Sequence, residues 1–454
     1  MKLDKPSAFR QHDDRRERAI LVGLVLPDQP PSWQEPLEEL GRLADTAGAD
    51  TVERVLQRRD RPDPRTFLGK GKAEEVASLV KQHDADLVIV DHDLSPSQAR
   101  NLEKAIGGTR VIDRTELILD IFVRRARTAM AKAQVELAQM EYALPRLKRL
   151  WTHLNREVGG GRVGIGVRGP GEKQIETDRR LVRTRIRDLR RSLETMEAHK
   201  MRQARGRSRW FTACFVGYTN AGKSTLLRAL TGADVFVQDR LFATLDTTTR
   251  AWEVVPGKRI FLSDTVGFIR DLPHHLVSSF RATLEEARAA DLLLHVVDAG
   301  DPDALEHVEI VEQTLSAIDV GGVPRIAVLN QVDRVRDPLS LRVLEDRLPG
   351  AVRTSAMTGE GLGALAEAVY DYVLRRHAGW RLTLDPGAGK LLARVRGMGE
   401  ILDVRYGAEH VEVDVLLSRP QAERLRLEGV RVEPLPEDAP AFLDEEAASS
   451  DGEA

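Results

Sequence analysis

The chain has 454 residues, long enough for several domains with cores of their own. Its 68 Lys and Arg residues nearly balance its 71 Asp and Glu residues, so the net charge of -3 gives no overall sign of nucleic-acid binding. A single cysteine, Cys214, excludes an internal disulfide framework, and no apolar run approaches the roughly 18 residues that span a bilayer. We therefore expect a soluble, cytoplasmic protein.

The first 126 residues alternate between expected strands and helices. The strands are expected at 19–26, 51–57, 87–90 and 110–112, and the helices at 37–47, 71–82 and 97–105. This alternation predicts a small α/β domain over residues 1–126. Within it, Phe67-Leu68-Gly69-Lys70-Gly71-Lys72 has two lysines at a helix start, where an anion can bind. A simple glycine turn is the favoured interpretation, because no metal-binding hydroxyl follows the lysine.

From Thr128 the apolar residues recur at steps of three and four, as on one face of a helix. The first such seam contains Leu137, Met140, Leu144, Leu147, Trp151 and Leu154, and the second contains Ile175, Val182, Ile186, Leu189, Leu193 and Met196. The two seams predict an antiparallel helical hairpin over residues 127–205. Pro145 is expected to kink the first helix, because it removes a backbone donor. A basic linker is expected around Lys200–Arg209.

Glycine and arginine dominate the stretch between and after the two seams. Gly159–Lys173 contains seven glycines together with Arg162 and Arg168, and seven arginines follow within Arg179–Arg191. Glycines allow close approach of the backbone to a surface, and arginines bind phosphate. We favour contacts of residues 159–191 with structured RNA over an ordinary solvated helix face.

Gly217-Tyr218-Thr219-Asn220-Ala221-Gly222-Lys223-Ser224 fits the phosphate-loop (P-loop) pattern G-x-x-x-x-G-K-[ST]. It follows the apolar run Thr212–Val216, which predicts a strand, and it precedes Thr225 and a helix-period run. In such a loop, backbone N–H groups cradle phosphate oxygens. Lys223 is then placed to reach the β- and γ-phosphates, and the Ser224 hydroxyl to bind Mg²⁺.

Four further motifs follow in the order found in guanine-nucleotide-binding domains. They are Phe242-Ala243-Thr244-Leu245-Asp246, Asp264-Thr265-Val266-Gly267, Asn330-Gln331-Val332-Asp333, and Ser355-Ala356-Met357 after Thr354. We expect Ser224, Thr244 and Asp264 to hold Mg²⁺ and the Gly267 N–H to lie near the γ-phosphate. Asp333 is expected to accept hydrogen bonds from the guanine edge. The motifs predict an α/β P-loop domain over residues 206–377 with Lys223, Thr244 and Gly267 in catalytic roles.

A smaller unit closes the chain. Strands are expected at 380–384, 401–406 and 410–416, and helices at 387–395 and 420–427, which predicts a small α+β domain over residues 378–435. The charged residues of 436–454 are all acidic, which favours a disordered tail.

The chain resembles the HflX family of translation-associated GTPases over nearly its whole length. The resemblance rests on Gly164-Ile165-Gly166, Arg168–Glu172, Gln174–Arg180, Leu241–Asp246, Asp264–Arg270, Leu68–Lys72 and Asp113-Arg114-Thr115. It implies GTP-dependent binding to the large ribosomal subunit near its peptidyl-transferase centre. In some members it also implies splitting of stalled ribosomes, or ATP binding by the N-terminal domain.

Two positions differ from common GTPase patterns. Gln331 stands where the family usually has lysine, which predicts a lower affinity for the nucleotide. Asp333 is present, so recognition of guanine is expected to be retained. Phe268 stands where Ras-like proteins have a glutamine that positions water, so slow intrinsic hydrolysis is expected. We expect the ribosome, or a monovalent cation near Asn220, to accelerate GTP hydrolysis in place of the missing glutamine. The alternatives are a GTPase acting on transfer RNA or assembly intermediates, and a nucleotide-gated scaffold with negligible turnover.

Overall fold

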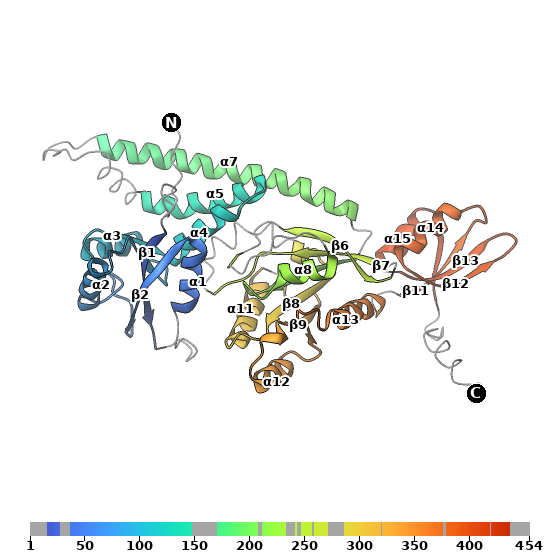
Figure 1. The fold of residues 1–454 in the computed structure, drawn as a ribbon. Helices are drawn as coiled ribbons and strands as arrows, with labels where there is room; N and C mark the ends of the chain where they lie inside the picture. Colours follow the sequence, from blue (N-terminus) through green and yellow to red (C-terminus); the bar gives the residue numbers. More distant parts are fainter. Residues whose placement is uncertain are drawn as a thin grey trace.

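The computed structural model describes residues 16–27, 37–147, 170–207, 211–232, 241–242, 247–256, 258–270, 286–318, 320–375, 378–417 and 419–435. Their strands form three separate sheets that follow one another along the chain (Figure 1). In these segments, no helix combines the length and the hydropathy needed to cross a membrane.

The first sheet is parallel, with strand order β2-β1-β3-β4. Its elements are β1 (Glu17–Val25), α1 (Leu37–Ala47), β2 (Ala49–Arg58), α2 (Lys70–Gln82), β3 (Leu87–Val90), α3 (Pro96–Ala105) and β4 (Arg110–Asp113). Successive residues of β1 face opposite sides: Leu21 packs in a cluster with α1, and Val22 in a second cluster with α2 and α3. The predicted strand–helix alternation is confirmed.

A helix that the sequence pattern did not predict follows directly on β4. This helix, α4 (Arg114–Arg125), is capped by Asp113, whose side chain accepts from the Glu116 N–H. Most of its residues are buried, including Leu117 and Phe122. It packs against α1 and against the next helix, α5 (Ala129–Ala143), and so links the first sheet to the helical region.

The two predicted apolar seams pack together. The kink expected at Pro145 appears as a 3₁₀ turn, η2 (Leu144–Arg146), and α7 (Pro170–Arg207) lies along α5 with Leu137, Val182, Ile186, Leu189 and Leu193 between them. Trp151, Leu154 and the glycine-rich residues 159–169 lie outside the described residues. The linker predicted at 200–209 was wrong as far as Arg207, because α7 continues to that residue.

The second sheet has the order β10-β9-β8-β5-β7-β6, in which only β6 is antiparallel to its neighbour. Its strands are β5 (Thr212–Gly217), β6 (Thr248–Val255), β7 (Lys258–Asp264), β8 (Leu292–Asp298), β9 (Arg325–Asn330) and β10 (Val352–Arg353). Its helices are α8 (Lys223–Thr231), α11 (Ala304–Ala317), η3 (Val332–Arg334), α12 (Pro338–Arg347) and α13 (Leu362–Arg375). The P-loop connects β5 to α8, as in a P-loop GTPase fold.

The third sheet is antiparallel around β11, with strand order β12-β13-β11-β14. Its unit contains β11 (Ala378–Leu384), α14 (Gly389–Met398), β12 (Glu400–Tyr406), β13 (Val411–Leu417), α15 (Arg419–Leu427) and β14 (Arg431–Pro434). The βαββαβ order is that of a ferredoxin-like unit. The sequence pattern missed β14, in which only Val432 is buried.

One hydrophobic cluster runs through three parts of the chain. It joins three parts: helices α1 and α4, which together with the first sheet form the first unit; helix α5; and the loops at the nucleotide end of the second sheet, called the nucleotide loops below. From the nucleotide loops the cluster includes Leu241, Phe242, Val266, Phe268 and Ile269. Such a continuous core makes the first unit and the nucleotide loops pack as one body.

Candidate active site

Backbone geometry explains the glycines of the P-loop. Gly222 has φ of +91°, and a Cβ atom there would lie 2.3 Å from the Asn330 side-chain nitrogen. A Cβ atom at Gly217 would lie 2.2 Å from the carbonyl oxygen of Val296 on β8. Both positions therefore exclude any side chain, and the predicted phosphate loop has the backbone conformation that requires glycine.

Lys223 lies buried beneath the P-loop. Its Nζ donates to the carbonyl oxygens of Gly217, at 3.1 Å, and of Tyr218, at 2.7 Å. Burial lowers the pKa of Lys223 to about 8, although the Asp264 carboxylate opposes this shift. The amine is thus held where a phosphate group would restore the missing counter-charge.

This pKa predicts proton uptake when nucleotide binds. Bound phosphate should raise the pKa of Lys223 again, so at pH 8 the Lys223 amine should take up about half a proton, and at pH 6.5 almost none. Calorimetry of Mg-GDP binding in buffers of different ionisation enthalpy measures this uptake. Equal heats in all buffers at pH 8 would contradict the prediction.

The two predicted magnesium ligands that the structure describes lie in direct contact. The Ser224 hydroxyl donates to Asp264 Oδ2 at 2.5 Å, and Asp264 is fully buried at the end of β7. A hydroxyl and a carboxylate are the hard oxygen donors that suit Mg²⁺. The third predicted ligand, Thr244, lies outside the described residues with Ala243, Leu245 and Asp246.

The D-x-x-G segment lies directly against the P-loop. Phe268 N–H donates to the Gly217 carbonyl at 3.1 Å, and the Phe268 carbonyl accepts from the Thr219 N–H at 2.7 Å. A Cβ atom at Gly267 would lie 2.7 Å from the Thr219 Cα. Thr265 anchors the segment through a 2.7 Å hydrogen bond to the Phe215 carbonyl. The structure thus brings together the predicted residues of these two motifs.

Asn330 connects the predicted base-binding loops to the P-loop. Its Nδ2 donates to the Ala221 carbonyl at 2.9 Å, and its Oδ1 accepts from Ala356 N–H at 3.2 Å and Thr354 Oγ1 at 3.3 Å. The Ala356 N–H, in the last of the predicted motifs, is therefore bonded to Asn330 here. Asp333 and Met357 are exposed, and Ser355 is buried.

A buried ion network joins the first unit to these loops, and the sequence analysis did not predict it. Arg114, 2% exposed, pairs with Asp91 at 2.7 Å and with Glu39, and it donates to the Arg270 carbonyl at 3.2 Å. Arg270 itself lies 3.5 Å from Asp91. The only signal in the sequence was the family string Asp113-Arg114-Thr115, which assigns no partner to Arg114.

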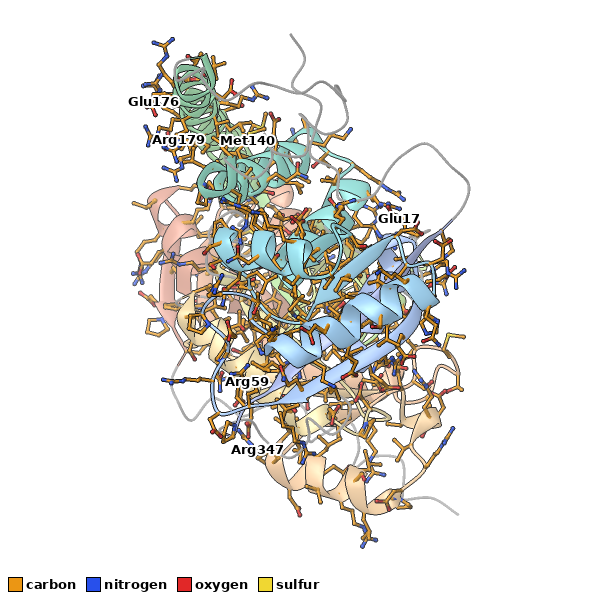
Figure 2. The ribbon with its side chains drawn as sticks, turned by 90° about the vertical axis from the view of Figure 1, so that its left-hand side faces the viewer. Glu17, Arg59, Met140, Glu176, Arg179 and Arg347 are labelled. Carbon is orange, nitrogen blue, oxygen red and sulfur yellow. The ribbon has the colours of Figure 1, made fainter. Side chains whose placement is uncertain are left out.

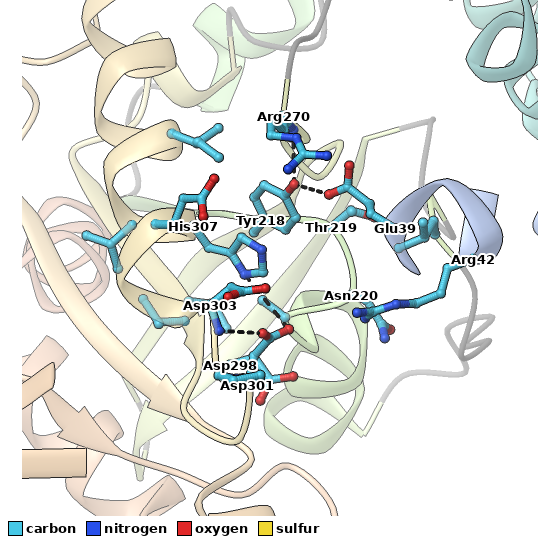
Figure 3. Close-up of a pocket in the computed structure, with 18 of the residues that line it drawn as sticks. Glu39, Arg42, Tyr218, Thr219, Asn220, Arg270, Asp298, Asp301, Asp303 and His307 are labelled. Atoms are coloured by element: carbon cyan, nitrogen blue, oxygen red, sulfur yellow. Dashed lines mark hydrogen bonds and ion pairs between the residues drawn. The ribbon is translucent and has the colours of Figure 1, made fainter. Parts of the chain in front are cut away.

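Tyr218 extends this network into the P-loop (Figure 3). Its hydroxyl donates to Glu39 and accepts from the Arg270 N–H at 3.0 Å, and its ring stacks on His307 with 3.7 Å between centroids. Burial opposes ionisation of Glu39, but Arg114, Arg270 and the Tyr218 hydroxyl hold its pKa below the usual value. The carboxylate is thus charged at neutral pH.

A second unpredicted contact involves Phe242, at the start of the motif that contains Thr244. Phe242 N–H donates to Thr219 Oγ1 at 3.0 Å, and its ring meets that of Phe122 on α4 edge-on, with 4.7 Å between centroids. Phe242 is 2% exposed. The first unit therefore contacts the loops on both sides of the P-loop.

A cavity of about 200 Å³ lies beside this junction (Figure 3). The cavity is lined on one side by Glu39 and Arg42 of α1 and on another by Asn220 of the P-loop. Asp298 at the end of β8 and Asp303 before α11 line the remaining side. The cavity is thus shared by the first unit and the nucleotide domain.

Three family models match consecutive parts of the chain. They are described as GTP-binding GTPase N-terminal, for residues 34–123, GTP-binding GTPase Middle Region, for 125–207, and 50S ribosome-binding GTPase, for 212–331.

Curated relatives match most of the chain. It is 45% identical over 385 residues to the GTPase HflX of Escherichia coli K12, which covers 84% of this chain and 88% of that protein. It is 43% identical over 433 residues to the GTPase HflX of Magnetococcus marinus, and the aligned residues cover 93% of this chain and 98% of that protein. Among solved structures, a GTP-binding protein from Sulfolobus solfataricus in complex with GDP is 24% identical to this chain. The superposition covers 78% of this chain and 98% of that chain, with a TM-score of 0.41.

Proposed function

Because this chain belongs to the HflX family and is a GTPase, we propose that it binds the large ribosomal subunit in its GTP form and hydrolyses GTP there, in ribosome splitting, rescue or recycling under stress. The observation that carries this proposal is the single hydrophobic cluster that joins the first unit and α5 to the nucleotide loops. A GTPase switch needs such a connection, because nucleotide can favour a ribosome-bound state only through contacts that differ between two conformations.

The contacts of the nucleotide loops supply that connection. Phe242 and Arg270 belong to the two segments that GTP and Mg²⁺ order in GTPases, and each contacts the first unit, at Phe122 and Asp91 respectively. Movement of either segment therefore changes the packing of α4 and α1. Because α4 packs on α5, the change reaches α5 and α7 as well.

The outer face of α7 supports contact with ribosomal RNA. Arg180, Arg183 and Arg187 follow one another at helical spacing and are exposed. Within the side chains described for α7, residues 176–196, these three form no ion pair. In contrast, Arg185 and Arg190 pair with Glu136 and Glu141 of α5, at 2.7 and 2.6 Å. Figure 2 shows Arg179 and Glu176 on the outer side of the same helix.

This difference predicts which arginines bind RNA. The triple change Arg180→Gln, Arg183→Gln and Arg187→Gln should weaken binding to large subunits at least about tenfold and reduce its salt dependence, because three phosphate contacts are lost. Sedimentation with purified subunits over a range of salt concentrations measures both effects. The double change Arg185→Gln and Arg190→Gln is the matched control, with a smaller expected loss because carboxylates already neutralise these charges. Equal losses in both variants would contradict the proposed RNA-binding face.

For hydrolysis, we assign Lys223 and the Gly267 N–H to the phosphates, and Ser224, Thr244 and Asp264 to Mg²⁺, which would neutralise charge on the phosphates. The remaining residues assigned to the nucleotide are Gly217 to Gly222, Thr225, Phe242 to Asp246, Thr265, Val266, Asn330 to Asp333 and Ser355 to Met357. Phe268 is 2% exposed and packs in the shared cluster, so its side chain does not orient water. Stimulation by the ribosome therefore remains part of the proposal, and a monovalent cation near Asn220 remains a prediction.

The test is GTP turnover by the purified chain with and without large ribosomal subunits, together with sedimentation in a GTP analogue and in GDP. Stimulated turnover with binding that depends on the GTP analogue is the expected result, and it would justify an assay of ribosome splitting. Binding to transfer RNA or to assembly intermediates, without binding to mature subunits, would replace the proposal by the assembly alternative. Binding without any turnover would leave a nucleotide-gated scaffold.

A further inference from the structure

Gln331 joins three parts of the nucleotide site. It follows β9 with φ of +62°, and its Nε2 donates to the Asn220 carbonyl of the P-loop at 3.2 Å and to Asp298 Oδ2 at the end of β8 at 2.8 Å. The side-chain amide therefore makes two bonds that an ammonium group at this position would also make. It brings no charge.

The missing charge matters at Asp298. Its side chain is 14% exposed, and its Oδ1 accepts from the Gly300 N–H at 2.9 Å. Burial raises the pKa of Asp298 to about 6, and nearby Asp301 adds to this shift, while Arg334 and Arg42 oppose it. A carboxylate in this setting needs a cation beside it to be held as an ion.

Arg334 places a cation beside this pair. Its Nη1 donates to Gln331 Oε1 at 2.5 Å and lies 3.9 Å from Asp298 Oδ2. The absence of a side chain at Gly300 allows this approach, because a Cβ atom there would lie 2.9 Å from the Arg334 Cβ. Arg334 also directly follows Asp333, the residue assigned to the guanine edge.

We propose that Gln331 and Arg334 together replace a single lysine: Gln331 supplies the hydrogen bonds to the P-loop and Asp298, and Arg334 supplies the positive charge. Arg334 is then a positioning residue for guanine nucleotides, since it holds Gln331 and the adjacent Asp333 in register with the P-loop. The inference rests on the proposed placement of guanine at Asp333.

A double-mutant cycle tests the division of roles, with the affinity for fluorescent GDP as the readout. Arg334→Ala should weaken GDP binding about threefold, because the arginine of this ion pair is 62% exposed and solvent screens its charge. In the background of Gln331→Lys the same change should have almost no effect, because lysine carries the charge itself. Arg334→Lys should retain most of the native affinity. Arg336→Ala, an exposed arginine two residues further along, is the matched control and should bind GDP as the native chain does.

Two outcomes would overturn the proposal. Equal losses from Arg334→Ala in both backgrounds would mean that Arg334 acts independently of Gln331. No loss in the native background would mean that Gln331 needs no cation. The placement of guanine is tested separately by Asp333→Asn, which should shift the nucleotide preference from GDP to xanthosine diphosphate. The Asp333 carboxylate accepts hydrogen bonds from the guanine amino group, whereas xanthine has an oxygen at that position, to which the amide of asparagine can donate. Failure of that shift would refute the base site itself, whatever the cycle shows.

Discussion

Replacement of Arg114 by methionine is expected to lower the free energy of unfolding by about 3–5 kcal/mol, the range for removing one partner of a buried ion pair. Methionine keeps much of the volume, but Asp91 and Glu39 would lose their shared cation in a buried setting. Arg270, 3.5 Å from Asp91, would compensate only in part. Denaturant unfolding followed by circular dichroism measures the loss.

The control for Arg114 is Arg185→Met. The pair of Arg185 with Glu136 has two hydrogen bonds of 2.7 and 2.9 Å, but the arginine is 52% exposed, so a loss below about 1 kcal/mol is expected. Neutralising the two carboxylates, with Glu39→Gln and Asp91→Asn in the Arg114→Met chain, should recover part of the loss. A similar small loss in both single variants would show that the buried network does not hold the first unit on the nucleotide loops.

Replacement of Lys223 by alanine should weaken GDP and GTP binding by at least about 100-fold, because a buried ammonium that bonds phosphate makes strong charge-assisted hydrogen bonds. The fold should remain stable, since the change removes a buried amine whose pKa is already lowered. Calorimetric titration with GDP measures the loss. Lys390→Ala, at an exposed lysine of α14, is the control and should not alter binding.

The same variant tests the connection between nucleotide and ribosome. If GTP favours the subunit-bound state, Lys223→Ala should bind large subunits equally with a GTP analogue and without nucleotide. A variant that has lost the nucleotide yet keeps the full affinity of the GTP form for subunits would contradict the switch.

The errors of the sequence analysis have identifiable causes. The pattern did not reveal α4 because the period of a short run of mostly apolar residues, such as Leu117–Phe122, does not distinguish a buried helix from a strand. The short β14 was missed because backbone hydrogen bonds to β11 hold a strand whose side chains are mostly exposed. The basic composition of 200–207 was interpreted as a linker, although arginine and lysine favour helices as readily as loops.

The sequence by itself determined the parts of this protein that depend on neighbours along the chain. The P-loop, the D-x-x-G segment and the seams of α5 and α7 follow from local backbone geometry and from the helical period, and the structure has them at the expected residues. Only the tertiary structure decided what these parts touch. Arg114 meets Arg270 across 156 residues, and Phe242 meets Phe122, because the packing of whole units brings such residues together and no local pattern records that packing.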